Sequence, residues 1–491
     1  MFNLLKEKIE NLPEEKRAAY NLAEIKRAFD FAEKAHRGQK RKSQDDYIIH
    51  PLSTALKIID FGLLDNASIM AALLHDVPED TQYSLNDIEK NFNKEIRFLV
   101  EGITKLGQIK YRGREERKLN IRNMIIAMAG DVRVILIKLA DRYHNMETLD
   151  YLPPEKQKRI ALETLEIYAP LAYRLGMGRV AGNLEDLAFP YVYPEEFNWL
   201  IKNLKERRKP LTKYLEGVIP LIKKRLEENE IYPLKIYYRV KHYYSLYKKL
   251  LNYDLNFERV YDIVALRIIL QNKEECYQTL GIIHKYWPPL PGKIKDYIAL
   301  PKPNGYQGLH TTVFCENKKK VEFQILTEEM YQKNEFGIAC HWYYKEVARK
   351  KVKGKTIPPE EELRLFNQLR EWKETFLKSP KKETSKLIES FKIDLLKDRI
   401  FVLTPKGEAI DLPKGATPVD FAYAIHTEIG DHCFAAKVDG KLVPLSYQLH
   451  SGEVVEIITQ KKKKPSKSWL KFVKTSLAKR RIKNLLLKEK I

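Results

Sequence analysis

Three features that would assign a chain to a special class of protein are missing from this sequence. No apolar run approaches the roughly 18 residues of a membrane-spanning helix, and the first residues carry acids early, without the apolar core of a signal peptide. The 4 cysteines are scattered and form no Cys-x-x-Cys pair, which argues against a disulfide framework or a zinc ribbon. We therefore expect a cytoplasmic protein that does not contact a membrane.

Acidic residues are few relative to basic ones, and the imbalance is concentrated at one end. Lysine and arginine number 88 against 66 acidic residues, for a net charge of +22, and residues 461–491 hold thirteen of the basic residues but only one acid, Glu489. Such a segment attracts polyanions in general, whether RNA, nucleotides or an anionic membrane, although a solvated tail that serves only solubility has the same composition.

The character of the sequence changes along its 491 residues, a length that suits several domains. The first part is helical at nearly every step and has almost no strand signal. Short β-branched or aromatic runs such as KIYYRV then alternate with helices, and later short strands are separated by Gly and Pro turns. We predict an all-α domain, an α+β domain, a helical connector, a small β-rich domain and a basic start of a helical region, with the boundaries 1–196, 197–346, 347–396, 397–460 and 461–491.

Histidines and aspartates occur in the helical part in the order His, His-Asp, Asp. His50 precedes a proline near a helix start, His75 and Asp76 are adjacent at the end of an apolar helix, and Asp141 lies on a later helix. A single histidine of this kind is more often a core or capping residue. Two imidazoles with two carboxylates, however, suit a divalent ion such as Mn²⁺, and an adjacent His-Asp pair is typical of phosphohydrolases that activate water with such an ion.

Further polar residues fit the same chemistry. Glu79 and Asp80 follow the His-Asp pair by less than two turns and suit acid–base catalysis, unless they form a solvated helix end. Asp141, Asn145 and Thr148 share one helix face, which indicates a pocket lined with polar groups.

These residues lie in segments that resemble a known family. HRGQKRKS, YIIHP, AALLHDVPEDT, EGITKL and IKLADRYHNMETL resemble the HD-type hydrolase domain of the long Rel/SpoT alarmone enzymes, which removes the 3′-pyrophosphate of ppGpp and pppGpp with Mn²⁺. The resemblance implies that the metal ligands are His50, His75, Asp76 and Asp141 and that the catalytic acids are Glu79 and Asp80. It further implies nucleotide contacts from Asn145 and Thr148, with Arg41 and Lys42 at the guanine base.

Cations are spaced regularly at the start of the α+β part. Lys241, Ser245 and Lys249 fall at i, i+4 and i+8, with Arg239 just before, so one helix face would present two ammonium groups and a hydroxyl to a triphosphate. Solvated surface lysines have the same pattern, and the spacing alone does not distinguish the two.

Two later strands carry a second polar group. Glu322 and Gln324 share one strand face with Leu326, because side chains alternate along a strand. Tyr306 and His310 are in step on the preceding strand, after a turn at Pro303–Gly305. A wet edge strand would have the same alternation.

These segments resemble the synthetase domain that follows the hydrolase in the same family and transfers pyrophosphate from ATP to the 3′-hydroxyl of GDP or GTP with Mg²⁺. The resemblance implies ATP-phosphate contacts from Arg239, Lys241 and Lys249, with Ser245 on the same face, a Mg²⁺ ligand in Asp262, and a nucleotide pocket formed by Lys302, Tyr306 and His310, with Tyr306 stacking on guanine. Glu322 would be the second metal ligand and a base for the attacking hydroxyl, with Gln324 beside it.

Four positions depart from the pattern usual in the synthetase domain. The family usually has Arg at Leu326, His at Tyr331, Ala at Asn334 and Ser at Gly308. Leucine cannot replace the charge of an arginine on the face that carries Glu322. A hydrolase with a weakened synthetase is therefore an open alternative.

The β-rich part resembles a third module of the same proteins. TPVDFAYAIHTEIGDHCFAAKV and the strands around it resemble a TGS domain, a small β-grasp-type fold. The resemblance implies contact with uncharged tRNA on the ribosome, with His426 at that contact; a structural histidine at a strand end is the plain alternative. A tRNA- or ribosome-binding regulator with vestigial catalysis is the alternative from another functional class.

Overall fold

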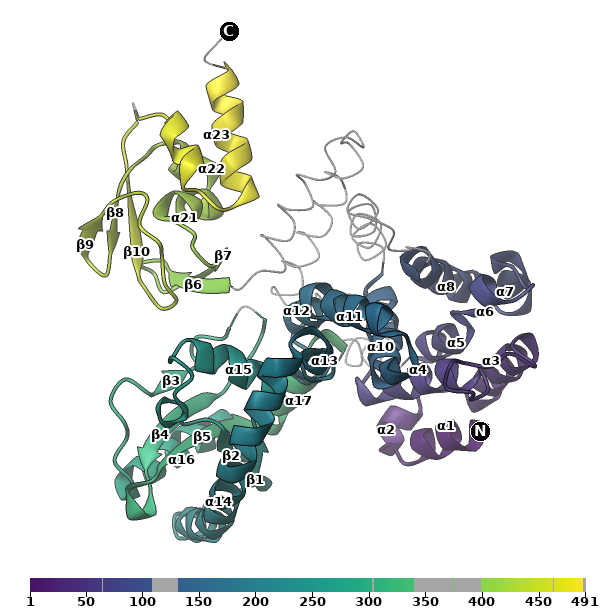
Figure 1. Cartoon of the computed structure of the whole chain (residues 1–491). Helices are drawn as coiled ribbons and strands as arrows, with labels where there is room; N and C mark the ends of the chain where they lie inside the picture. Colours follow the sequence, from purple (N-terminus) through teal and green to yellow (C-terminus); the bar gives the residue numbers. More distant parts are fainter. Residues whose placement is uncertain are drawn as a thin grey trace. The chain divides into compact units, whose positions relative to one another are not determined.

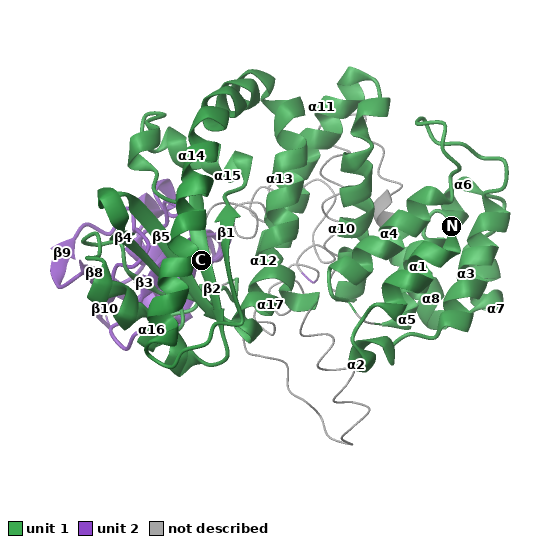
Figure 2. Cartoon of the chain, turned by 90° about the horizontal axis from the view of Figure 1, so that it is seen from below, with its two compact units in different colours: residues 1–112, 123–370 green, residues 113–122, 371–491 purple. Residues whose placement is uncertain are grey.

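The computed structural model describes residues 1–63, 65–107, 131–302, 304–339, 374, 399–461 and 463–488. They belong to two compact units, coloured separately in Figure 2: unit 1, residues 1–112 and 123–370, and unit 2, residues 113–122 and 371–491. The helical connector predicted at 347–396 lies outside the described residues, apart from Glu374.

The first part of unit 1 is a helical domain (Figure 1). Asn21, Asp65 and Asp131 begin three of its helices, each with a side-chain oxygen that accepts a backbone N–H of the first turn. Its helices are α1 (Phe2–Glu10), α2 (Glu14–Arg17), α3 (Leu22–Ala35), α4 (Ile49–Asp60), α5 (Asn66–Leu74), α6 (Val77–Asp80), α7 (Leu85–Asn91), α8 (Lys94–Gly107), α10 (Val132–Glu147), α11 (Pro154–Glu163), α12 (Ala169–Arg174) and α13 (Gly178–Val192).

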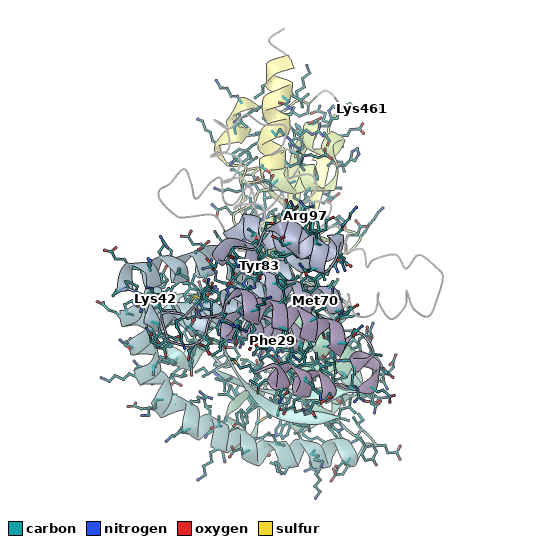
Figure 3. The ribbon with its side chains drawn as sticks, turned by 90° about the vertical axis from the view of Figure 1, so that its right-hand side faces the viewer. Phe29, Lys42, Met70, Tyr83, Arg97 and Lys461 are labelled. Atoms are coloured by element: carbon teal, nitrogen blue, oxygen red, sulfur yellow. The ribbon has the colours of Figure 1, made fainter. Side chains whose placement is uncertain are left out.

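Helix α5 is the centre of this domain because its sequence, NASIMAALL, is apolar nearly all round. It packs against α3, α4 and α8. Figure 3 labels two of the core side chains in this part, Phe29 of α3 and Met70 of α5, both buried. Two of the metal-ligand candidates, His75 and Asp76, lie directly at the C-terminal end of this buried helix.

The second part of unit 1 is a mixed sheet covered by helices. The strands follow the order β1-β2-β5-β4-β3, in which β2 and β5 are parallel and the other neighbours antiparallel. The elements are α14 (Pro194–Glu227), β1 (Lys235–Val240), α15 (Tyr243–Leu251), β2 (Val264–Leu270), α16 (Lys273–Tyr286), β3 (Lys295–Asp296), β4 (Leu309–Phe314), β5 (Lys320–Thr327) and α17 (Glu328–Phe336).

The two faces of this sheet differ in chemistry. Phe323 of β5 is fully buried and stacks on Trp287, which follows α16, at a ring distance of 5.9 Å. The next residue, Gln324, projects to the opposite face because side chains alternate along a strand. There it meets Arg267 of β2 and, through it, Glu335 of α17. One face is therefore the apolar core, and the other presents polar groups.

Helix α13 belongs to both parts of unit 1 (Figure 1). It packs against α10, α11 and α12 and also against α14, α15 and α17. Phe189 is a member of the core beneath the mixed sheet. Gly182 lies so close to the His242 ring that an added Cβ would be 2.3 Å from it, so a larger side chain there would have to displace this ring.

Unit 2 is a small β-rich fold followed by a helix. It contains the hairpin β6 (Arg399–Leu403) and β7 (Ala409–Pro413), helices α21 (Pro418–Ile425) and α22 (Thr427–Asp431), the sheet β10-β8-β9 formed by β8 (Cys433–Val438), β9 (Lys441–Val443) and β10 (Val455–Thr459), and α23 (Ser476–Lys488). Trp469, Val473 and Ile482 of the basic segment share a buried cluster with α21.

A carboxylate joins that segment to the β-rich fold. Asp420 of α21 is fully buried and accepts hydrogen bonds from the backbone and hydroxyl groups of Thr417 and Thr475 and from the backbone of Lys474, at 2.8–3.1 Å. The basic segment, predicted as a separate region, therefore packs on the preceding domain.

The predicted sequence of an all-α, an α+β and a small β-rich part is confirmed. The exact domain boundaries stay a prediction, and the one drawn at residue 196 falls in the first turn of α14. None of the described helices combines the length and apolarity needed to cross a bilayer.

Candidate active sites

Three elements of the helical domain bring the predicted metal ligands together. His50 is in the first turn of α4, His75 ends α5, and Asp76 begins α6. One ligand atom from each lies within 4.8 Å of the others, and both imidazoles are buried. Asp141 of α10 adjoins this group, with its Oδ1 3.2 Å from Nε2 of His50.

The hydrogen bonds of His75 fit a metal ligand. Its Nδ1 is 2.7 Å from the carbonyl oxygen of Ala72 and must carry the proton, because a carbonyl only accepts. In the neutral ring Nε2 then has a free lone pair, yet it is buried without a hydrogen bond, 3.1 Å from Oδ1 of Asp76. A lone pair facing a carboxylate is unfavourable unless a cation lies between them.

Residues of α10 surround the ligands with a second layer of hydrogen bonds. Asp141 accepts from Lys138 at 2.6 Å and from Asn145 at 2.5 Å. Burial alone would raise the pKa of Asp141, but the charge of Lys138 and the contact with His50 hold it well below its usual value. His144 lies with its Nδ1 2.8 Å from Nδ1 of His50. Burial and His50 lower the pKa of His144 to about 3, so the His144 ring is neutral and its Nδ1 can accept a hydrogen bond from Nδ1–H of His50.

The predicted catalytic acids lie beside the ligands on α6. The Tyr47 hydroxyl is 3.0 Å from Oδ2 of Asp76 and 2.5 Å from Oδ2 of Asp80, so it can donate to either carboxylate. Glu79 remains in contact with solvent, but partial burial raises its pKa to about 7 despite the opposing charge of Lys138. A carboxyl with such a pKa can hold or release a proton at neutral pH.

One of the predicted base-binding residues, Arg41, is connected to the metal-ligand candidates through Asn145, which also donates to Asp141. Arg41 donates from Nη2 to Oδ1 of Asn145 at 3.0 Å and places its guanidinium 5.9 Å from the centre of the Tyr47 ring. Its Nη1 is buried without a hydrogen-bond partner. Lys42, labelled in Figure 3, is exposed. Thr148 follows α10 and donates to the carbonyl oxygen of His144 at 3.1 Å.

In the α+β part the predicted cations converge on one carboxylate. Lys241 and Lys249 each place Nζ 2.7 Å from a different oxygen of Asp262. Burial alone would raise the pKa of Asp262, but the two lysines lower it to about 2. Arg239 lies on β1 opposite Ala265.

The prediction that Lys241, Ser245 and Lys249 share one helix face is wrong. Helix α15 begins at Tyr243, so Lys241 precedes it and the helical spacing does not apply. The Ser245 hydroxyl donates to Glu185 of α13 at 3.1 Å, which also pairs with Lys248. Ser245 therefore contacts the helical domain, while the two lysines contact Asp262.

A chain of hydrogen bonds links the other polar residues of the sheet. The Tyr306 hydroxyl is 2.6 Å from Nε2 of His310, whose Nδ1 is 3.2 Å from Oε1 of Glu322. Gln324 donates to the same oxygen at 3.2 Å and accepts from Arg267 at 3.3 Å. Tyr306 was predicted on the strand with His310 but precedes β4, which begins at Leu309.

Charge and burial prepare this site for anions. Burial, reinforced by Lys295 and Lys241, lowers the pKa of Lys302 to about 8. Its Nζ lies 4.5 Å and 4.7 Å from the ring centres of Tyr297 and Tyr306. Burial alone would raise the pKa of Glu322, but the His310 hydrogen bond lowers it, so the carboxylate is ionised at neutral pH.

Comparison with known proteins identifies the three parts in order. Family models match an HD domain at residues 28–178, the region found in RelA/SpoT proteins at 238–349, and a TGS domain at 400–459. The chain is 49% identical over 467 residues to the guanosine-3′,5′-bis(diphosphate) 3′-pyrophosphohydrolase of Aquifex aeolicus, covering 95% of this chain and 65% of that protein. The chain belongs to the Rel/SpoT family.

Two further Rel/SpoT relatives match over similar lengths. The GTP pyrophosphokinase of Myxococcus xanthus is 47% identical over 468 residues, 94% of this chain and 60% of that protein. The bifunctional (p)ppGpp synthase/hydrolase SpoT of Escherichia coli K12 is 43% identical over 465 residues, 94% of this chain and 64% of that protein. The chain thus spans a little under two thirds of the length of these relatives.

The departures from the usual Rel/SpoT pattern are concentrated around α17. Leu326 is buried, 1% exposed. Asn334 is also buried and hydrogen-bonds the backbone of Gln307. Tyr331 packs at the edge of the core beneath the sheet. None of these contacts follows from local sequence spacing.

Sequence reasoning also missed several supporting residues of this Rel/SpoT chain. His144 and Tyr47 lie within quoted motifs, IKLADRYHNMETL and YIIHP, but nothing in their spacing marks them as neighbours of His50 and Asp76. Arg267 lies in the apolar strand VALRIIL, where a charge without a nearby acid was the available signal.

His426 occupies a helix start and not a strand end. It is the N-cap of α22, and its Nδ1 accepts the backbone N–H of Glu428 at 3.3 Å. The ring is exposed, so one face of it is available to a ligand.

Proposed function

We propose that this chain is a bifunctional alarmone enzyme. Its helical domain hydrolyses the 3′-pyrophosphate of ppGpp and pppGpp, and its α+β domain transfers pyrophosphate from ATP to GDP or GTP. The observation that carries the proposal is that one chain holds two separate polar sites, a His/Asp pocket and a cation-lined carboxylate site, in the order typical of Rel/SpoT proteins. Because the proposed substrates are nucleotides, we also propose that the protein acts in the cytoplasm.

For hydrolysis we propose that Mn²⁺ is held by His50, His75, Asp76 and Asp141. The ion supplies positive charge to the phosphate and lowers the pKa of a bound water. Arg41 and Asn145, which are hydrogen-bonded to each other beside Asp141, would orient the nucleotide. Glu79, with a pKa near 7, can give a proton to the 3′-oxygen as its bond to phosphorus breaks.

A paired measurement tests the hydrolase. Asp76→Ala removes a carboxylate that faces both imidazoles, so we expect loss of Mn²⁺ binding and of ppGpp hydrolysis by at least about a hundredfold. Asp30→Ala on the exposed face of α3 is the matched control. Undiminished hydrolysis by a folded Asp76→Ala protein would refute the assignment.

For synthesis we propose that Mg²⁺ is held by Asp262 and Glu322. Burial and the charge of Asp262 oppose ionisation of Glu322, although the His310 hydrogen bond still lowers the pKa of Glu322. The two carboxylates are therefore near enough to interact and could hold one ion between them. The ion and the lysines neutralise charge on the triphosphate. Lys241 and Lys249, which pair with Asp262 in this structure, would bind ATP phosphates, while Glu322 accepts the proton of the attacking 3′-hydroxyl. Tyr306 stacks on guanine beside Lys302.

Glu322→Gln separates the two activities. The amide keeps the size of the side chain but cannot accept the hydroxyl proton, so we expect pyrophosphate transfer to fall by about a hundredfold or more with hydrolysis unchanged. Glu274→Gln, an exposed position of α16, is the control. Equal loss of both activities in Glu322→Gln would contradict separate sites.

We propose further that unit 2 binds uncharged tRNA on the ribosome. The exposed ring of His426 and the basic residues after 460 support this. Binding of deacylated tRNA to the full chain should weaken steeply with salt, and His426→Ala should weaken it at every salt concentration. Binding unaffected by either change would contradict the proposal.

A further inference from the structure

Among the described residues, the side chain of Asn334 hydrogen-bonds the loop that carries Tyr306 to α17. Asn334 donates from Nδ2 to the carbonyl oxygen of Gln307 at 2.7 Å and accepts the backbone N–H of Gln307 at 3.0 Å. One amide therefore satisfies both main-chain groups of one residue, as a neighbouring strand would. This fixes the peptide units on either side of Gln307, and with them the backbone of Tyr306.

The rest of this loop is closed mainly on itself. Lys302 and Tyr306 share a backbone hydrogen bond of 3.0 Å, and the backbone of Tyr306 also donates to the side chain of Asn304 at 3.3 Å. Beyond Gln307, the Gly308 carbonyl accepts from Tyr297 at 2.9 Å. Asn334 is thus the described side chain that ties the segment before β4 to a helix of the domain.

Two departures from the usual family pattern meet at this loop. A Cβ added to Gly308 would lie 3.6 Å from Cβ of Leu326, so Leu326 supports the loop from one side but offers it no hydrogen bond. Asn334, where the family usually has Ala, supplies the polar contact. In this chain the loop therefore packs against Leu326 on one side and is hydrogen-bonded by Asn334.

The residue after Asn334 secures the opposite half of the site. Glu335 pairs with Arg267 at 2.8 Å, Arg267 binds Gln324, and Gln324 binds Glu322. Adjacent residues of α17 therefore set the loop with the stacking ring and the strand with the proposed base. Their spacing determines where an acceptor nucleotide, held at its base, places its hydroxyl.

We propose that Asn334 is a positioning residue for the guanine nucleotide that accepts pyrophosphate in this chain. It acts through the Tyr306 loop and does not touch the ATP phosphates. The inference rests on the proposed synthetase activity.

The test is Asn334→Ala in the full chain, with steady-state pyrophosphate transfer measured against GDP and ATP separately. Loss of two hydrogen bonds to the loop should raise KM for GDP roughly tenfold, with KM for ATP changed less than about twofold. Hydrolysis of ppGpp by the same protein reports whether unit 1 is intact. Gln332→Ala, an amide on the same helix that bonds to Glu328, is the matched control.

Asn334→Asp keeps the size of the side chain, so it tests the inference if the alanine variant does not fold. Its carboxylate still accepts the Gln307 N–H but faces the Gln307 carbonyl oxygen without a proton, and KM for GDP should again rise. A parent protein that transfers no pyrophosphate would overturn the proposed function and the inference together. An active parent whose folded Asn334 variants keep its KM for GDP, or change both KM values equally, would overturn the inference alone.

Discussion

Introducing an arginine at position 326 tests whether the synthetase site has lost a charge or has been rebuilt without one. Leu326 lies at the fourth ladder position of the β2–β5 pair, opposite Ile269, and both side chains are buried. Two carboxylates are near this face: Glu335 is already paired with Arg267, and Glu322, four residues away on β5, is already bonded to His310 and Gln324. A guanidinium placed at 326 would therefore be buried beside another cation without a carboxylate of its own.

The cost of burying an arginine at position 326 exceeds the free energy that a new contact with substrate phosphate would contribute. A charge-assisted contact with substrate phosphate is worth about 1.5–3 kcal/mol. An uncompensated buried charge costs about 3–5 kcal/mol, and the added volume in a packed core costs a further amount of about 1–3 kcal/mol. We therefore expect Leu326→Arg to lower the stability of unit 1 and to reduce pyrophosphate transfer.

The assay compares three proteins by urea unfolding and by transfer rate. Leu326→Met conserves volume and polarity and should cost less than about 1.5 kcal/mol, so it controls for disturbance of the core. The reasoning is refuted if Leu326→Arg is as stable as the parent and transfers pyrophosphate faster. That result would mean that the native site lacks a cation it can still accommodate.

Three other outcomes follow from described contacts. Because Lys302 loses its charge as pH rises through about 8, kcat/KM for transfer should fall above that pH, and Lys302→Arg should move the fall upward. His144→Ala removes the hydrogen-bond partner of His50 and should weaken Mn²⁺ binding about 10–100-fold by calorimetry; unchanged affinity would show that His144 is only a packing residue. Asp420→Ala leaves buried donors of residues 474 and 475 unpaired and should destabilise unit 2 by about 3 kcal/mol, seen as faster amide exchange at Thr475; native protection would contradict this.

The sequence predicted most successfully where the signal was local. The adjacent pair His75–Asp76 lies at the end of an apolar helix, and helix α5 indeed delivers both residues to one pocket. Alternation along β5 placed Glu322 and Gln324 together, and they share a hydrogen bond. The division into helical, mixed and β-rich parts followed from periodicity, which depends on neighbours along the chain.

Prediction failed where partners are distant in the chain. Ser245 was assigned to the face of the two lysines from its helical spacing. Its actual acceptor, Glu185, is 60 residues away on another part of unit 1 and could not be inferred from that spacing. The Asn334–Gln307 pair joins a helix to a loop 27 residues earlier. Periodicity contains no information on which elements meet, and each of these contacts depends on the tertiary arrangement.

Because helix α13 packs against both parts of unit 1, the chain cannot easily be cut between these parts. A cut before Gly178 would leave Phe189 with the mixed-sheet domain but would deprive the helical domain of the helix that α11 and α12 pack against. A fragment that ended after Val192 would expose Phe189 to water on the helical half. Domain exchange between relatives should therefore succeed only when the helical domain, α13 and the mixed-sheet domain are exchanged together.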